Sequence, residues 1–227
     1  MRKPLLFLPG PMQVPDHVRA AGDRPLFNHR SPQMLELLSK LEAGCRPLFG
    51  TAGNVVFLAS SGTGAMESAI VNLTSPGEEV IVVVGGTFAG RWSDIAKAYG
   101  LTVHTVDVDW RMGATFAEVE KALGEYPKAE LIFHTWSESS TGVLNDLADI
   151  GRLVRSQNKI YVADAVSGLA VSPMSMDDWN IDAVVAGSQK GLMVSPGLGV
   201  AAIGPRAWEK NERSASHRFY FDWKKLK

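Results

Sequence analysis

The sequence predicts an α/β fold, a mostly parallel, doubly wound sheet with helices on both faces. Short apolar runs typical of buried strands alternate with helical patterns along most of the chain. Several of these runs end directly at polar or glycine-rich segments. Residues 159–199 hold two of them, one followed by Asp164 and the other by residues 187–190. Ligands bind beyond the carboxyl ends of the strands in such sheets, so a site is expected there.

The N-terminal part is predicted to be an extended arm followed by a helix. Four prolines between residues 1 and 15 disfavour a helix in the arm. A helix is expected to begin at Ser31 and Pro32, because serine caps helix N-termini and proline suits the first turn. Its expected apolar face comprises Met34, Leu35, Leu38 and Leu41.

The remaining elements follow from apolar runs and from the residues that end them. Strands are predicted at residues 54–59, 79–84, 101–106, 131–134, 159–163, 183–186 and 198–203. Helices are predicted at residues 65–73, 88–99, 115–123 and 146–157. Thr115 and Glu118 have the spacing of a capping box, and Gly124 is expected to end that helix. The charged and aromatic stretch 206–227 resembles a helix that leads out of the domain.

Composition bounds the class of protein. The 227 residues are enough to bury a full core, and 45% apolar with 21% charged residues is ordinary for a globular chain. A net charge of −1 argues against a nucleic-acid partner. No apolar run reaches membrane-spanning length, so no membrane partner is expected. Cys45 is the single cysteine, which indicates a reducing compartment and hence a cytoplasmic location. No metal site is predicted.

Two glycine-containing segments are candidate cofactor contacts. In residues 60–67 (SSGTGAME), small residues after a strand would let backbone N–H groups reach an anion at a helix N-terminus. The alternative is a tight turn with a helix cap, and the segment lacks the Gly-Lys pair of a P-loop. Phe88 follows a strand and two glycines, where its ring could stack on a flat heterocycle. The alternative is that Phe88 is part of the core.

Two further segments carry polar side chains after buried strands. In residues 134–143 (HTWSESSTGV), His134 is interpreted as a hydrogen-bonded strand-end histidine, and Ser140 and Thr141 either bind a ligand or cap a turn. Asp164 and Lys190 suit pyridoxal 5′-phosphate, which needs a lysine for its Schiff base and a carboxylate to keep its ring nitrogen protonated. The alternative is a salt bridge or two unrelated surface charges.

The joint order of these segments resembles a known family. The chain is similar to the class V aminotransferases of PLP fold type I, close to the alanine–glyoxylate and serine–glyoxylate (serine–pyruvate) group. The resemblance covers the whole chain, and GSQK following DAVS is specific. The matching stretches are LPGP, NHRSPQM, SSGTGAMESAIVNL, GGTFAGRW, ESSTGV, DAVSGLA, GSQKGLMVSPGLG and FYFDW.

The resemblance implies roles for individual residues. Lys190 would bind the cofactor and shuttle the substrate proton, and Asp164 would pair with the ring nitrogen. Phe88 and Val166 would cover the two ring faces. The other implied cofactor contacts are Thr63, Gly64, Ala65 and Gln189 at the phosphate and Ser140 near the phenolic oxygen.

The resemblance also implies an assembly and a reaction. Gly10, His29 and Arg30 would lie near the active site, across a homodimer interface. The expected reaction moves an amino group from a small amino acid, alanine or serine, to a 2-oxo acid such as glyoxylate or pyruvate. Alternatives are a cysteine desulfurase, for which Cys45 lies in the wrong region, an aminoethylphosphonate aminotransferase, or a PLP-binding domain without turnover.

The resemblance finally suggests a division of the chain. Residues 1–30 would be the N-terminal arm, 31–205 the PLP-binding large domain, and 206–227 the start of a connection to a C-terminal domain that the family carries and this sequence does not include. That domain holds the arginine that binds the substrate carboxylate. It is expected to be absent or supplied by a separate chain, so these residues alone should bind the cofactor but transaminate poorly.

Overall fold

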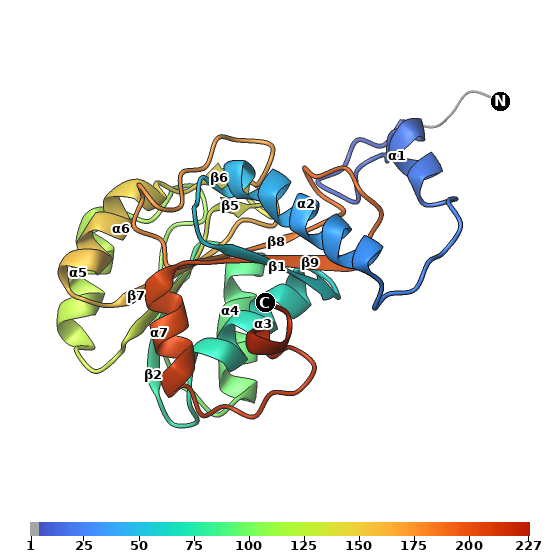
Figure 1. The fold of residues 1–227 in the computed structure, drawn as a ribbon. Coiled ribbons are helices and arrows are strands. Elements are labelled where there is room, and N and C mark those ends of the chain that lie inside the picture. Colours follow the sequence, from blue (N-terminus) through green and yellow to red (C-terminus); the bar gives the residue numbers. More distant parts are fainter. Residues whose placement is uncertain (1–4) are drawn as a thin grey trace.

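Seven apolar segments form one sheet in the computed structural model, which describes residues 5–227 (Figure 1). The strand order is β1-β9-β8-β7-β4-β2-β3, and neighbours run parallel except at β9, which is antiparallel to both β1 and β8. A mostly parallel sheet is therefore confirmed. The strands are β1 (Asn54–Ala59), β2 (Glu79–Val84), β3 (Thr102–Asp107), β4 (Leu131–Thr135), β7 (Ile160–Asp164), β8 (Ala183–Gly187) and β9 (Leu198–Ile203).

Helices cover both faces of the sheet, as predicted for a doubly wound fold (Figure 1). On one face the buried core includes Phe49 of α2, Val119 of α5 and Ile150 of α6. On the other it includes Met66 of α3 and Trp92 of α4. The helices are α1 (Asp16–Ala21), α2 (Pro32–Phe49), α3 (Gly62–Leu73), α4 (Thr87–Ala98), α5 (Phe116–Glu125), α6 (Leu147–Ser156) and α7 (Pro205–Arg213).

The capping residues mark where these helices begin more reliably than glycines mark where they end. Helix α3 begins at Gly62, three residues earlier than expected, because the Ser61 side chain accepts a hydrogen bond from the Gly64 N–H and caps it. The capping box of Thr115 and Glu118 is confirmed. Helix α5 nevertheless continues to Glu125, so the prediction that Gly124 ends it is wrong. A small hairpin of β5 (Ser137–Glu138) and β6 (Val143–Leu144) was not predicted.

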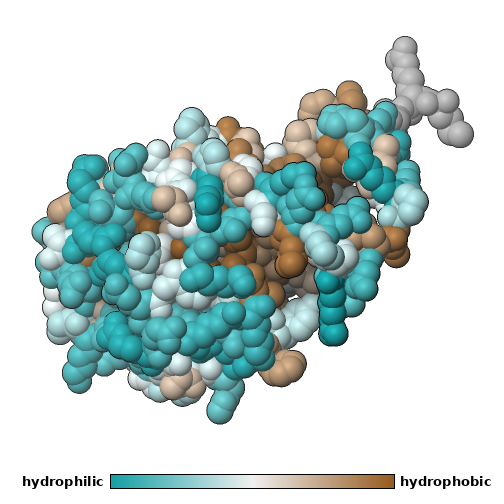
Figure 2. Space-filling view, viewed as in Figure 1, coloured by the Kyte–Doolittle hydropathy of each residue, from teal (hydrophilic) through white to brown (hydrophobic). Residues whose placement is uncertain are grey.

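The N-terminal arm has little core of its own. Residues 5–15 are neither helix nor strand, and the short helix α1 was not predicted. Helix α2 begins at Pro32 with Ser31 as its cap, as expected. Its predicted apolar face, however, stays exposed: Leu35 is 66% and Leu38 41% accessible. Figure 2 shows hydrophobic residues gathered on the side that carries α2 and the arm.

The C-terminal segment packs onto α3. Trp223 is fully buried in a 3₁₀ turn (Trp223–Lys225), and its indole N–H donates to Ser68 Oγ at 3.1 Å. Asn72 Oδ1 accepts from the Trp223 N–H at 3.1 Å and from Asn211 Nδ2 at 3.0 Å. The stretch expected to be a connector thus covers the helix whose N-terminus lies at the candidate site.

His134 is a buried strand-end histidine, and its strand, β4, lies inside the sheet between β7 and β2. It is 1% exposed, and its Nδ1 lies 2.8 Å from the Tyr161 hydroxyl. Its Nε2 has no hydrogen-bond partner among the described residues. Burial lowers the pKa of His134 from 6.5 to about 4.

This burial predicts an acid-sensitive fold. Below pH 6.5 the His134 imidazole is protonated in the unfolded chain but stays neutral in the folded protein. The free energy of unfolding should therefore fall as the pH drops from about 6.5 to about 4. The loss at pH 4 should approach about 3 kcal/mol. Urea unfolding at pH 7.5 and 4.5 measures it. His134→Gln should remove this component, whereas the exposed His217→Gln should not. Equal pH dependence in all three proteins would contradict the prediction.

No helix among residues 5–227 is both long enough and apolar enough to cross a membrane.

Candidate active site

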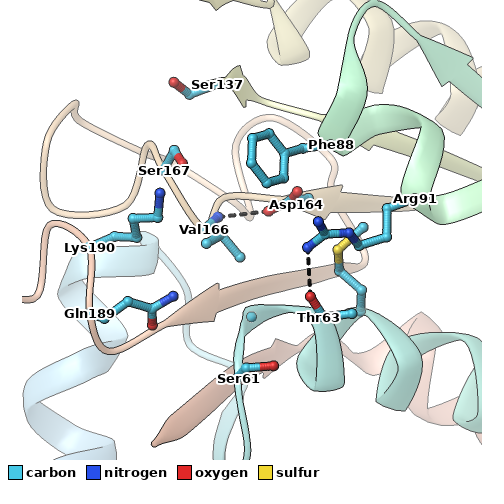
Figure 3. Close-up of a pocket in the computed structure, with 12 residues that line it drawn as sticks. Ser61, Thr63, Phe88, Arg91, Ser137, Asp164, Val166, Ser167, Gln189 and Lys190 are labelled. Atoms are coloured by element: carbon cyan, nitrogen blue, oxygen red, sulfur yellow. Dashed lines mark hydrogen bonds between the residues drawn. The ribbon is translucent and has the colours of Figure 1, made fainter. Parts of the chain in front are cut away.

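A cavity lies where the carboxyl ends of β7 and β8 meet the N-termini of α3 and α4 (Figure 3). Its volume is about 100 Å³, and it opens to solvent. Six residues predicted from the sequence line it: Thr63, Phe88, Asp164, Val166, Gln189 and Lys190. Six others complete the lining: Ser61, Gly62, Met66, Arg91, Ser137 and Ser167.

Asp164 is the last residue of β7 and is 4% exposed. Its Oδ1 accepts a hydrogen bond from the Val166 N–H at 2.8 Å, and Thr135 Oγ1 lies 3.5 Å from Oδ2. Burial, together with the nearby Glu138 charge, raises the pKa of Asp164 from 3.8 to about 6. A buried carboxylate of this kind gains most from a cationic N–H donor in the cavity.

Lys190 follows β8, the strand next to β7, on a loop that is well fixed. The Ser188 N–H bonds the Leu198 carbonyl at 3.0 Å, and the Met193 N–H bonds the Lys190 carbonyl at 2.9 Å. Burial lowers the pKa of Lys190 below its usual 10.5, and the Asp164 charge partly offsets this shift. A larger fraction of Lys190 is therefore uncharged, and hence nucleophilic, near neutral pH than of a solvated lysine.

The N-terminal arm reaches this loop. The Met12 N–H donates to the Gln189 carbonyl at 2.8 Å. A Cβ atom at Gly10 would lie 2.5 Å from Lys190 Cδ, and its φ is +148°, so only glycine fits there without strain. Gly10 therefore lies against the lysine stem of its own chain, whereas the resemblance implied a position across a dimer interface. His29 and Arg30 are exposed and do not line the cavity of the single chain.

Phe88 and Val166 point into the cavity from α4 and from the turn after β7 (Figure 3). Val166 also packs against the start of α3, because a Cβ atom at Gly62 would lie 2.7 Å from Val166 Cγ2. Gly62 thus allows the helix N-terminus to approach the cavity closely. These two apolar groups suit an aromatic ring between them.

The N-terminus of α3 offers fewer donors than expected. A helix leaves its first N–H groups without helical partners. The Ser61 hydroxyl accepts a hydrogen bond from the Gly64 N–H, and the Ser61 carbonyl accepts one from the Ala65 N–H at 2.9 Å. Neither Gly64 nor Ala65 lines the cavity. The N–H groups left to face an anion are those of Gly62 and Thr63.

Ser140 does not line the cavity and instead supports α4. Its Oγ donates to Glu138 Oε1 at 2.7 Å and accepts from the Thr87 N–H at 3.0 Å. Glu138 is 1% exposed, and its Oε2 accepts from the Ala89 N–H at 2.8 Å. Because the N-cap Gly86 has no side chain, Glu138 and Ser140 together cap the helix that carries Phe88. Sequence reasoning missed Glu138, although a carboxylate just after a buried strand was the signal.

A lysine and a buried carboxylate at neighbouring strand ends of a doubly wound sheet define an α/β domain suited to a heterocyclic cofactor. A family profile described as aminotransferase class-V matches residues 16–216. The chain belongs to this family.

Three similar proteins illustrate the relationship. A soluble hydrogenase small subunit of Synechococcus is 35% identical over 97% of this chain and 58% of its own length. The L-aspartate–glyoxylate aminotransferase of Paracoccus denitrificans is 35% identical over 96% of this chain and 56% of its own. The crystal structure of alanine–glyoxylate aminotransferase from Nostoc has a TM-score of 0.94 at 30% identity, over 100% of this chain and 61% of that one. The chain therefore spans less than two thirds of the proteins it matches.

Membership of this family implies pyridoxal phosphate as the cofactor. The residues present fit that group. Asp164 is a buried acceptor for a ring nitrogen, Lys190 is a partly desolvated amine, and Phe88 and Val166 bound a flat space. At the α3 end, the N–H groups of Gly62 and Thr63 suit a phosphate. Gln189 lines the cavity, and its amide NH₂ group is the donor that would face a phosphate.

Proposed function

We propose that this chain is the cofactor-binding part of a pyridoxal phosphate-dependent aminotransferase. It would move an amino group from a small amino acid, alanine or serine, to a 2-oxo acid such as glyoxylate or pyruvate. The observation that carries the proposal is the placement of Asp164 and Lys190 in one cavity at the ends of two paired strands. The glyoxylate aminotransferases among its relatives support the choice of acceptor.

The residues of the chain have separable tasks in this reaction. When bound, pyridoxal phosphate supplies a carbonyl that takes the amino group and a ring that accepts electron density. Lys190 Nζ holds the cofactor and then moves the proton of the substrate Cα, for which its lowered pKa suits it. Asp164 keeps a proton on the ring nitrogen. Phe88 and Val166 orient the ring and exclude water.

The test is a half-reaction. The chain is mixed with pyridoxal phosphate, and the visible spectrum is followed after adding alanine, serine or aspartate. The proposal predicts saturable cofactor binding and conversion by at least one of these amino acids, reversed by glyoxylate. Binding without conversion by any amino acid would favour a cofactor-binding domain without turnover. Cys45 is a poor candidate for a desulfurase nucleophile, because it is half-buried on α2, does not line the cavity, and burial raises the pKa of its thiol.

The assembly is proposed to be a homodimer formed through α2 and the N-terminal arm. Leu35, Leu38 and Leu41 on α2 and Leu26 and Phe27 in the arm are exposed, with Leu26 99% accessible. Large exposed apolar surfaces of this kind mark interaction sites. His29 and Arg30 lie in the same region, so they would reach a cavity only in a dimer. The single cysteine supports a cytoplasmic location.

This assembly predicts that Leu35→Glu, placed on the most exposed part of the α2 face, shifts the chain from dimer to monomer. A buried unpaired carboxylate costs several kcal/mol at an interface. Sedimentation velocity at several concentrations measures the shift. Glu120→Lys on the exposed side of α5 is the charge-changing control and should leave the dimer intact. A parent chain that is monomeric at high concentration with cofactor bound would contradict the proposal.

The resemblance places the arginine that binds the substrate carboxylate in a C-terminal domain. We propose that such a domain, covalently continuous or separate, completes the substrate site. Without it, residues 1–227 would bind the cofactor but transaminate poorly, because bidentate contact with arginine orients a carboxylate. Adding the matching C-terminal domain should raise the half-reaction rate.

A further inference from the structure

Arg91 bridges the two helices that meet at the cavity. It lies on α4, one turn after Phe88, and is half-buried. Its Nη1 donates a hydrogen bond to Thr63 Oγ1 on α3 at 2.7 Å. Its Cζ lies 5.0 Å from the centre of the Phe88 ring. Figure 3 shows the Arg91 side chain reaching from α4 to Thr63.

The contact fixes the direction of the Thr63 hydroxyl group. A guanidinium group has only donors, so Thr63 Oγ1 is the acceptor in this pair. The single O–H proton of Thr63 is then free to be donated to another group. Thr63 lines the cavity, and its backbone N–H is among those the helix leaves unpaired. With Arg91 bound to its Oγ1, Thr63 can donate both its hydroxyl proton and its backbone N–H at the N-terminus of α3.

The charge of Arg91 adds to this arrangement. A fixed positive charge behind a helix N-terminus favours an anion in front of it. Arg91 and Lys190 are the two basic residues in the cavity lining. Lys190 comes from the loop after β8, whereas Arg91 contacts α3, so the two cations serve different ends of the cavity. The guanidinium over the Phe88 ring also restricts that ring.

We propose that Arg91 is a positioning residue for the phosphate end of the cofactor, acting by orienting the Thr63 hydroxyl as a donor. The inference rests on the proposed function, since it takes pyridoxal phosphate as the ligand. It differs from a role in which Arg91 itself binds the substrate carboxylate, because here Arg91 acts through its Nη1 contact with Thr63.

The test compares two ligands that differ only in the phosphate. Dissociation constants of pyridoxal phosphate and of pyridoxal are measured by absorbance and protein fluorescence for the parent, Arg91→Met, Arg91→Lys and Thr63→Val. Arg91→Met should weaken pyridoxal phosphate binding about 10-fold or more, the scale of a charge-assisted hydrogen bond. It should weaken pyridoxal binding much less, because pyridoxal has no phosphate and would lose only the restraint on the Phe88 ring. Arg91→Lys should lose less, because it keeps the charge without the fixed fork. Arg152→Met, on the exposed side of α6, is the matched control and should change neither constant.

The coupling energy between Arg91 and Thr63 shows whether Arg91 acts on phosphate binding through Thr63. If Arg91 acts through Thr63, adding Arg91→Met to Thr63→Val should cause less loss than the two single changes would together. Equal weakening for both ligands, full additivity, or unchanged pyridoxal phosphate binding would overturn the proposal. If Arg91→Met does not fold, judged by circular dichroism, Arg91→Lys and Thr63→Val still decide it. Failure of the parent chain to bind pyridoxal phosphate would instead refute the proposed function.

Discussion

Lys190→Ala is expected to abolish covalent attachment of pyridoxal phosphate and to slow the amino-acid half-reaction by about 10²–10⁴-fold, the usual contribution of a positioned acid–base group. Lys190 is the one lysine in the cavity lining, and its Nζ is partly desolvated. Non-covalent binding should persist, because Asp164, Phe88 and the α3 N-terminus are unchanged.

Borohydride reduction followed by peptide mass analysis measures the attachment directly. The parent should carry the reduced cofactor on Lys190, and the variant should carry none. Lys159 is an internal control, because it lies before β7, and its Nζ donates to the carbonyls of Pro127 and Ala129. Trapping on Lys159, or an unchanged yield from Lys190→Ala, would refute the role of Lys190.

Asp164→Asn is expected to slow the half-reaction by about 10²–10³-fold, or about 3–4 kcal/mol, the scale of losing one electrostatic contact in a dry site. The two side chains are nearly isosteric, so the contacts with Val166 and Thr135 can remain and the fold should persist. The variant loses the negative charge that would hold a proton on the ring nitrogen, and its NH₂ group replaces one acceptor oxygen, so the Thr135 hydroxyl would have to accept from it.

The pH dependence of this variant gives an independent check. The pKa of Asp164 is about 6 because of its burial, so its charge is present above that pH and is lost below it. Cofactor affinity of the parent should therefore fall as the pH drops through about 6, and Asp164→Asn should lack this step. An equal half-reaction rate in parent and variant would show that Asp164 has no electronic role.

Sequence patterns predicted the strands and the cavity end of the sheet because these features are local. An apolar run reports burial, and the residue after it lies at a strand end. The direction of a strand relative to its neighbours is not a local property. The apolar run of β9 therefore could not show that this strand is antiparallel to β1 and β8. The hairpin of β5 and β6 has only two residues per strand, too few for periodicity.

The missed details of the site depend on tertiary packing. The early start of α3 arises because Ser61 caps it and Gly62 packs on Val166, although glycine is a poor helix former. Ser140 was expected to contact the cofactor, but its hydroxyl donates a hydrogen bond to Glu138 Oε1 instead. The sequence showed the amphipathic pattern of α2. Such a pattern does not reveal whether the apolar face packs on its own domain or on another surface.

The position of β9 also sets the order in which the molecule can assemble during synthesis. β1 lies at the sheet edge and pairs with β9, so Asn54 meets Ile203 only after nearly the whole described chain has left the ribosome. Such distant pairings raise contact order and slow folding. Thr63 follows β1, and Lys190 precedes β9, so the two ends of the cavity come together only at this late step. We therefore expect nascent chains to expose an unpaired β1 edge and to need protection from aggregation until β9 docks.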